Sequence, residues 1–292
     1  FIDMRDLIKR LKYYLRYILI SDEKYIKYKF KKRFDYELNI SNPKTINEKI
    51  QWLKLFDRTP LHTKCADKYL VREYIKEIIG EKYLIPLIFS TFEAKDINVE
   101  NLPNYPTVIK ANHTRGAFLI KDKNNIDLKN IQKKLNRELN TNFYYRTREW
   151  QYKNILPRII VEKMLLDENG NLPIDYKIWC MNGKVIMFQV DTGSQGNHII
   201  TFFDKNWKVL SFKKAYPINE NVNIPNNLEE MLQIAEKLSK DFLFVRVDLY
   251  NINNKVYFGE LTFHPESGFG KFYPENSDFE LGKKLNLGII NE

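Results

Sequence analysis

Two stretches near the end of the chain decide the fold: Phe244-Val-Arg-Val-Asp-Leu-Tyr250 and Val256-Tyr-Phe-Gly-Glu-Leu-Thr262. Both are rich in β-branched and aromatic residues, which favours strands. Each contains one carboxylate, Asp248 in the first and Glu260 in the second. Arg246 precedes Asp248 by two residues, so the period of two along a strand predicts that both side chains share one face.

The turn between these strands determines whether the two carboxylates meet. A three-residue loop, Ile252–Asn254, would let Asn254 adopt the left-handed conformation that such loops need. Asp248 would then pair with Phe258, two residues from Glu260, and both carboxylates would face the same side as diagonal neighbours. A loop with an even number of residues would put them on opposite faces. A shared face is therefore expected only if the loop has three residues.

A basic residue beside two acids on one sheet face has two interpretations. Mg²⁺ prefers hard oxygen ligands and usually takes one or two from protein, so Asp248 and Glu260 are candidates to hold it against nucleotide phosphates. Alternatively, Arg246 forms a plain ion-pair network with them on a solvent-facing sheet. The spacing alone leaves both interpretations open.

The order of residues in this segment resembles the metal-binding end of the ATP-grasp fold, as in D-alanine–D-alanine ligases. The shared pattern is Arg-x-Asp on one strand, Glu-x-(Asn/Thr) on the next, and a Pro and a Gly shortly after, here Pro265 and Gly268. From about Asn47 to Gly282 the chain is similar to the TupA-like ATP-grasp family of bacterial surface-polysaccharide clusters. The matching stretches are Ala66–Tyr74, Val108–His113, Pro157–Glu162, Asp175–Lys177, Arg246–Tyr250 and Phe258–Phe263.

The resemblance implies an α+β fold in which two ATP-grasp subdomains clamp ATP, preceded by a mainly helical N-terminal domain. The residue pattern of the N-terminal region independently predicts helices, since Thr45 and Glu48 form a capping box that opens a helix. It departs from the Rossmann-like front domain that is usual in this fold. We expect a basic amphipathic segment at 1–40, a mainly helical region at 41–100, subdomain 1 at 101–160, and subdomain 2 with the metal site at 161–292.

The resemblance also assigns ATP binding to particular residues. Lys110 ends a strand and is expected to reach the α- and β-phosphates, for which a compact ammonium charge is suited. Glu162 stands where the family places the adenine–ribose hinge, and Lys177 is expected to be a second phosphate contact. The full ATP-binding set is Lys110, His113, Arg115, Gly116, Glu162, Asp175 and Lys177.

The metal and the chemical step are assigned in the same way. Asp248 and Glu260 would bind magnesium, with Thr262 as a further ligand in a position where many ATP-grasp enzymes have Asn. Arg246 would stabilise the oxyanion of a tetrahedral intermediate, and Lys177 is the second catalytic residue. The candidates for substrate contact are His264, Asn112 and Lys68.

Several side chains have a second interpretation. His113 contacts phosphate or acceptor, or it only caps its strand. His264 either touches substrate or lies near the metal pair without such a role. The polar run Asp191–Asn197 binds an acceptor or is a flexible hairpin loop, and the aromatic cluster that begins at Phe143–Tyr145 stacks on a sugar or packs under the lid.

The amino-acid composition limits the classes of protein to which the chain could belong. The 292 residues are 43% apolar and 14% aromatic, enough to bury a sizeable core. Cys65 and Cys180 are expected to be buried reduced thiols, which fits a cytoplasmic location. No run of about 18 uncharged apolar residues predicts a spanning helix. Charged residues interrupt the apolar positions among the first twenty, which argues against a signal peptide.

The net charge of +10 is concentrated at one end of the chain. Residues 1–35 contain eleven Lys or Arg and five Asp or Glu, whereas the remaining 257 residues carry only +4. A nucleic-acid partner is not expected, because such proteins usually interleave basic and aromatic residues within the folded core. Leu7, Leu11 and Leu15 recur at helical spacing among the basic residues. This helix either docks peripherally, on the inner membrane or on capsule-assembly enzymes, or packs on the next domain.

Three functions compete. The first is a carboxylate–amine ligase that uses Mg-ATP and an acyl phosphate to join an amino acid or small amine to a uronic acid of a capsular polysaccharide or its precursor. The second is a glycosyltransferase of polysaccharide biosynthesis, which would need a nucleotide-sugar site. The third is a non-catalytic ATP-binding assembly factor. The presence of Lys110, Lys177 and Arg246 argues against the third.

Overall fold

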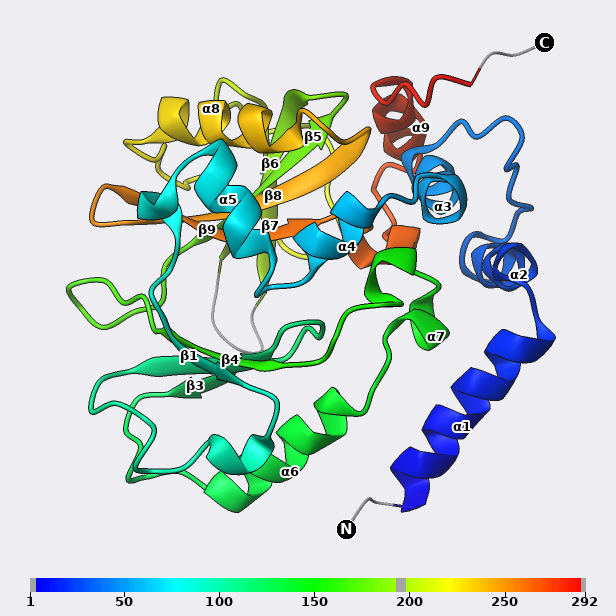
Figure 1. Cartoon of the computed structure of the whole chain (residues 1–292). Coiled ribbons are helices and arrows are strands. Elements are labelled where there is room, and N and C mark those ends of the chain that lie inside the picture. Colours follow the sequence, from blue (N-terminus) through cyan, green and yellow to red (C-terminus); the bar gives the residue numbers. More distant parts are fainter. Residues whose placement is uncertain (1–3, 193–197, 290–292) are drawn as a thin grey trace. The chain divides into compact units, whose positions relative to one another are not determined.

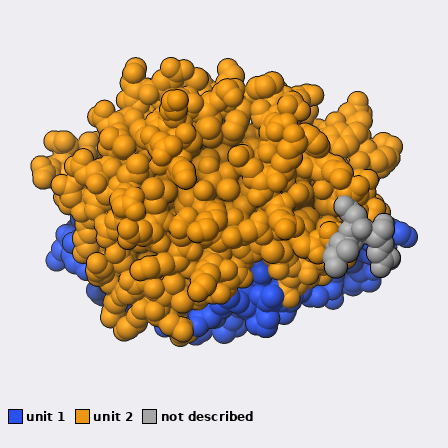
Figure 2. Space-filling model, turned by 90° about the horizontal axis from the view of Figure 1, so that it is seen from above, with its two compact units in different colours: residues 1–25, 59–72, 85–165 blue, residues 26–58, 73–84, 166–292 orange. Residues whose placement is uncertain are grey.

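The computed structural model describes residues 4–192 and 198–289, which gather into two compact units (Figure 2). Unit 1 comprises residues 1–25, 59–72 and 85–165, and unit 2 comprises residues 26–58, 73–84 and 166–292. The expected boundary between residues 160 and 161 lies close to the observed one at 165 and 166. The expected front segments, 1–40 and 41–100, each contribute to both units.

Unit 1 is built on an antiparallel four-stranded sheet in the order β1-β4-β2-β3. The strands are β1 (Leu87–Thr91), β2 (Thr107–Ala111), β3 (Phe118–Ile120) and β4 (Ile159–Lys163). Its helices are α1 (Met4–Leu19), α4 (Pro60–Ala66), α6 (Leu128–Leu139) and α7 (Tyr144–Thr147), with short 3₁₀ turns at Ala94–Asp96 and Trp150–Tyr152. Ile131 and Leu135 of α6 pack with Ile109 and Ile159 in one apolar cluster, so α6 covers one face of the sheet and leaves the other for polar side chains.

Unit 2 contains an antiparallel five-stranded sheet in the order β7-β6-β5-β8-β9. The strands are β5 (Asp175–Met181), β6 (Lys184–Thr192), β7 (Ile199–Phe203), β8 (Phe244–Ile252) and β9 (Lys255–Thr262). Helix α8 (Leu228–Ser239) covers one face (Figure 1). Helices α3 (Ile46–Phe56) and α9 (Asn276–Lys283) share an apolar cluster with Trp179 and Phe244 of the other face.

Two helices contain the boundaries between units, α2 (Asp22–Phe34) and α5 (Val71–Ile78). The predicted capping box is confirmed, since Thr45 Oγ1 accepts from Glu48 N at 3.1 Å and Glu48 Oε2 accepts from Thr45 N at 2.9 Å. Asn182 and Gly183 form the turn that joins β5 to β6. With its mixture of helices and antiparallel sheets, the chain has the predicted α+β class.

The prediction of a three-residue loop between β8 and β9 is wrong. Ile252 pairs with Lys255, so the loop has two residues, Asn253 and Asn254, both with positive φ (51° and 56°) as a type I′ turn requires. An even loop alone would separate the carboxylates. A bulge at Gly259 adds one residue to β9, and this restores their shared face.

Cys65 and Cys180 are both buried and free, as predicted. Over residues 4–192 and 198–289, we find no helix long and apolar enough to cross a membrane.

Candidate functional site

One face of the unit 2 sheet carries the apolar cluster at one end and, directly beyond Trp179, a dense group of charged side chains. Asp248 pairs directly with Glu260 on one side and with Lys177 on the other, so three strands place charges in one row. Arg246 pairs with Thr262 in the next row. We call the following set the carboxylate cluster: Asp175, Lys177, Asp191, Lys214, Arg246, Asp248, Glu260, Thr262 and Glu266.

Arg246 holds Asp248 with two parallel hydrogen bonds. Its Nε donates to Asp248 Oδ1 at 2.7 Å, and its Nη2 donates to Asp248 Oδ2 at 2.5 Å. Nη2 also donates to Thr262 Oγ1 at 3.1 Å and lies 3.7 Å from Glu260 Oε1. The guanidinium fork therefore fixes the relative positions of all three predicted metal ligands.

Lys177 lies between two carboxylates on the same face. Its Nζ forms ion pairs with Asp175 and with Asp191, the latter at 2.9 Å. Burial alone would lower the pKa of Lys177, but the carboxylates of Asp175 and Asp248 outweigh it and raise the pKa. Lys177 therefore stays charged, as a phosphate contact requires.

Burial also shifts the pKa values of Asp248 and Arg246. It raises the pKa of Asp248 to about 7, against the opposing effect of the Arg246 guanidinium. For Arg246, burial lowers the pKa, yet the neighbouring Asp248 carboxylate outweighs this and raises it. Of the two carboxylates, Glu260 is the accessible one, because its side chain is 41% exposed compared with 4% for Asp248.

Sequence reasoning missed Lys214 and Glu266. Lys214 is buried, forms an ion pair with Glu266, and has its Nζ 5.8 Å from the ring centre of Trp179. Burial, together with the positive charges of Arg246 and Lys177, lowers the pKa of Lys214 to about 7. Lys214 lies in an irregular segment after β7, where no periodic pattern pointed to a face.

Glu266 belongs to a backbone segment with an uncommon conformation. Glu266, Ser267 and Gly268 have positive φ angles of 49°, 57° and 68°. Buried polar side chains of α3 support this segment: Gln51 Nε2 donates to the carbonyls of Ser267 and Gly268, and Lys54 Nζ donates to Ser267 Oγ at 3.0 Å. Such strain persists only where surrounding contacts enforce it and is common near functional sites.

In unit 1, the predicted ATP residues Lys110 and Glu162 lie side by side on the face that α6 leaves open. Lys110 Nζ is 2.8 Å from Glu162 Oε2, and Arg72 Nη1 donates to Glu162 Oε1 at 3.2 Å. Two cations thus share one carboxylate. Arg72 lies in a stretch that carried the family resemblance, but it was not assigned to the site.

The loop of residues 112–117 contains the predicted ATP contacts His113, Arg115 and Gly116, and we call it the phosphate loop. It is fixed to α6. Thr114 Oγ1 donates to Glu138 Oε2 at 3.0 Å, and a Cβ on Gly116 would approach Glu138 Oε1 to 2.9 Å. Arg115 is 63% exposed, and its guanidinium lies 5.3 Å from the ring centre of Phe143. The loop also lines a cavity of about 790 Å³ whose other wall includes α1.

The other predicted contact residues of unit 1 have internal partners. His113 is buried, and its Nε2 donates to Thr141 O at 2.9 Å, which favours the strand-capping interpretation. Asn112 is fully buried and donates to Leu156 O at 3.0 Å. Lys68 Nζ donates to Thr114 O at 2.8 Å and so braces the phosphate loop.

His264 is buried at the end of β9, next to the positive-φ segment. In the aromatic cluster, Tyr144 is buried and donates to Asp22 Oδ2, and Tyr145 packs on Tyr14 of α1, which favours packing over sugar stacking. In the polar run 191–197, Asp191 and Thr192 end β6, and residues 193–197 lie outside the described part of the chain.

The donor set of the cluster fits magnesium. In the described part of the chain, no group of three or more His, Cys, Asp or Glu side chains could hold a metal by itself. Magnesium does not need one, because it commonly binds through one or two carboxylates plus substrate phosphates. Asp248 and Glu260 are opposite each other and supply this number.

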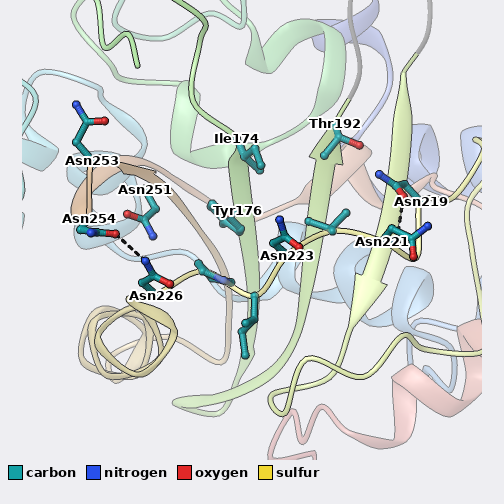
Figure 3. Close-up of a pocket in the computed structure, with 13 residues that line it drawn as sticks. Ile174, Tyr176, Thr192, Asn219, Asn221, Asn223, Asn226, Asn251, Asn253 and Asn254 are labelled. Atoms are coloured by element: carbon teal, nitrogen blue, oxygen red, sulfur yellow. Dashed lines mark hydrogen bonds between the residues drawn. The ribbon is translucent and has the colours of Figure 1, made fainter. Parts of the chain in front are cut away.

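A second hollow lies on the α8 face of the same sheet, at the end where β5 begins and β6 ends (Figure 3). It encloses about 520 Å³ and is lined by seven asparagines, Tyr176, Thr192 and four apolar residues. Asn226 Nδ2 donates to Asn254 Oδ1 at 3.0 Å, whereas the buried atoms Asn251 Oδ1 and Thr192 Oγ1 have no hydrogen-bond partner among the described residues. Its lining therefore offers amide groups and no charged side chain.

Comparison with known proteins gives one strong match. A family model described as TupA-like ATPgrasp matches residues 48–286. A search of curated proteins found no significant match.

Solved structures give weaker similarities. An L-amino acid ligase from Bacillus licheniformis is 13% identical, with 85% of this chain and 56% of that chain covered and a TM-score of 0.47. A D-alanine–D-alanine ligase from Bacillus anthracis is 17% identical, with 68% and 57% covered and a TM-score of 0.41. The chain thus spans little more than half the length of these two ligases.

Proposed function

The chain belongs to the TupA-like ATP-grasp family, and on this basis we propose that it is an ATP-dependent ligase that joins a carboxylate to an amine. Its membership bears out the resemblance seen in the sequence and, with it, the ATP-grasp fold. The observation that carries the proposal is the direct opposition of Asp248 and Glu260 under the Arg246 fork, with Lys177 in the same row.

The roles proposed for these residues follow from their charges. Asp248 and Glu260 would hold Mg²⁺, with the Thr262 hydroxyl as a weaker oxygen ligand, and the ion would neutralise phosphate charge. Each Asp248 oxygen accepts one hydrogen bond from Arg246 and keeps a second lone pair that could bind a cation. Lys110 and Lys177 would bind ATP phosphates as compact cations.

The reaction would proceed through two displacements. An oxygen of the acid attacks the γ-phosphorus of ATP, the bond from that phosphorus to the bridging oxygen breaks, and ADP leaves. The amine then attacks the acyl phosphate carbon, loses a proton and expels inorganic phosphate. Arg246 would donate to the oxyanion that develops in this second step, a contribution typically worth a few kcal/mol.

The proposed acid is a uronic acid of a surface polysaccharide or its precursor, and the amine is an amino acid or another small amine. ATP consumption places the proposed reaction in the cytoplasm.

The test is to incubate the protein with Mg-ATP, without nucleotide sugar, and with pairs drawn from a panel of uronic acids and amines. ADP release and mass spectrometry of products are the measurements. The proposal expects ADP only with an active pair, and a product whose mass equals acid plus amine less water. Absence of ADP with every pair, or transfer of a sugar from a nucleotide sugar without ATP, would contradict it. Asp248→Asn serves as the inactive control.

A further inference from the structure

Helix α1 presents a largely exposed apolar surface. Seven large apolar side chains of this helix are each between 45% and 79% exposed: Met4, Leu7, Ile8, Leu11, Leu15, Ile18 and Leu19. At about 100° per residue, these positions fall within a single arc of roughly 120° around the helix axis. Isolated exposed apolar residues are ordinary, but a continuous stripe of this size marks an interaction surface.

The opposite side of α1 is already engaged within unit 1. Arg10 Nη1 donates to Asn140 O at 2.6 Å, and Asp6 forms an ion pair with Arg137 at 2.7 Å. The Tyr17 ring packs edge-on against Tyr144 at 5.4 Å between ring centres. The helix is therefore fastened by its polar and aromatic side. Leu7 and Leu11 also line the cavity that α1 shares with residues 114–116, whereas the other members of the stripe do not.

Basic side chains border the stripe along one edge. Lys12 follows the arc directly in the helical projection, Lys9 lies further round, and both are exposed. The one acidic residue of α1, Asp6, is on the fastened side. An apolar stripe edged by lysines is the pattern of helices that lie in the headgroup region of anionic membranes.

We propose that α1 lies flat on a membrane that contains anionic lipid, with its apolar stripe in the boundary between headgroups and acyl chains. Lys9 and Lys12 would contact lipid phosphates, a term that weakens as salt rises. This surface would hold unit 1 at a membrane whatever reaction the protein catalyses, so the proposal does not rest on the proposed function.

The test is flotation of the full chain with vesicles of phosphatidylcholine alone and with vesicles of phosphatidylcholine and phosphatidylglycerol in equal amounts. Leu15→Glu should lower the partition coefficient by at least about tenfold, because it places a charge in the apolar stripe. The matched control is Leu172→Glu, which makes the same change at a leucine of similar exposure in unit 2 (53%, against 47% for Leu15) and should bind like the wild type.

A second pair of variants tests the charge. Lys12→Glu should weaken binding to the phosphatidylglycerol vesicles and not to the neutral ones, whereas Lys184→Glu, on the exposed β5–β6 hairpin, should leave both unchanged. Three results would overturn the proposal: no flotation of the wild type with anionic vesicles, equal flotation of the Leu15 and Leu172 variants, or a wild-type dimer in solution that Leu15→Glu converts to monomer.

Discussion

The charged faces of the two sheets differ in the balance of their charges. On the unit 1 face, the single carboxylate of Glu162 is shared by Lys110 and Arg72, so positive charge is in excess. In the unit 2 cluster, five carboxylates surround three basic side chains, so negative charge is in excess. The first balance suits an anion such as phosphate, and the second suits a cation.

Arg246 tests whether the unit 2 cluster has a chemical role or only a structural one. We expect Arg246→Lys to lower kcat by roughly two to three orders of magnitude, because lysine cannot reproduce the fork that bonds Asp248 and Thr262 together. The apparent affinity for ATP should change little. Steady-state kinetics with an active substrate pair provides the measurement, and a variant that retains most of its activity would show that Arg246 only neutralises Asp248.

The bulge at Gly259 tests whether the cluster depends on strand register. Gly259→Val should disturb the bulge, because a Cβ there would lie 3.0 Å from Asp248 O and 3.2 Å from Tyr250 Cε2, and regular pairing of residue 259 would return Glu260 to the opposite face. The variant should therefore lose the stabilisation by Mg-ATP, about 2.7 kcal/mol at a ligand concentration 100 times the Kd. Thermal unfolding with and without Mg-ATP measures the loss, and cooperative unfolding serves as the check that the variant is folded. A folded variant with the full shift would break the link between the bulge and the ligand.

Lys110 tests the phosphate role of the unit 1 face. Lys110→Ala should raise the Kd for ATP roughly tenfold while kcat changes less, because the lost charge acts in binding. Calorimetry of ATP binding is the measurement. Lys95→Ala is the control, since Lys95 pairs with Glu93 on the surface of the same unit. Equal affinities for the two variants would remove Lys110 from the site.

Asp278 provides a buried carboxylate of unit 2 outside the cluster. Burial raises the pKa of Asp278 to about 6, and hydrogen bonds from Asn47 oppose the rise. Because the folded state keeps the proton longer than the unfolded state, the contribution of Asp278 to stability is present below about pH 4 and is lost as pH rises through 6.

Asp278→Asn should therefore gain stability relative to the wild type across that interval, by roughly 1 kcal/mol at pH 7, since the loss of a carboxylate from the first turn of α9 offsets part of the gain. Urea unfolding at pH 4 and pH 7 measures the difference. A difference that is the same at both pH values would contradict the raised pKa.

The two sheets also show which contacts a sequence can predict. Partners two residues apart on one strand follow from the period of two, and this predicted the shared face of Arg246 and Asp248. The opposition of Asp248 and Glu260 depended on a turn and a bulge that cancel each other. The three-residue loop was wrong, and the carboxylates share a face only because Gly259 adds the missing residue.

Other contacts could not be predicted from the spacing of residues. Lys214 reaches the cluster from an irregular segment, so neither a helical nor a strand period marks it. The resemblance assigned roles to Asn112, Lys68 and His113. The sequence around them does not indicate that each donates to a backbone carbonyl. The sequence showed the amphipathic pattern of α1. It did not show which side of this helix contacts the rest of unit 1.

The central claim is that opposed carboxylates of unit 2 bind the metal of Mg-ATP, and Glu260→Gln tests it most directly. The variant keeps the shape of the accessible carboxylate and removes its charge, and Glu280→Gln makes the same change at an exposed residue of α9. Melting temperatures are measured with and without saturating Mg-ATP. The account predicts that the wild type and Glu280→Gln gain the full shift and that Glu260→Gln gains little of it. An equal shift in all three proteins would contradict the metal assignment.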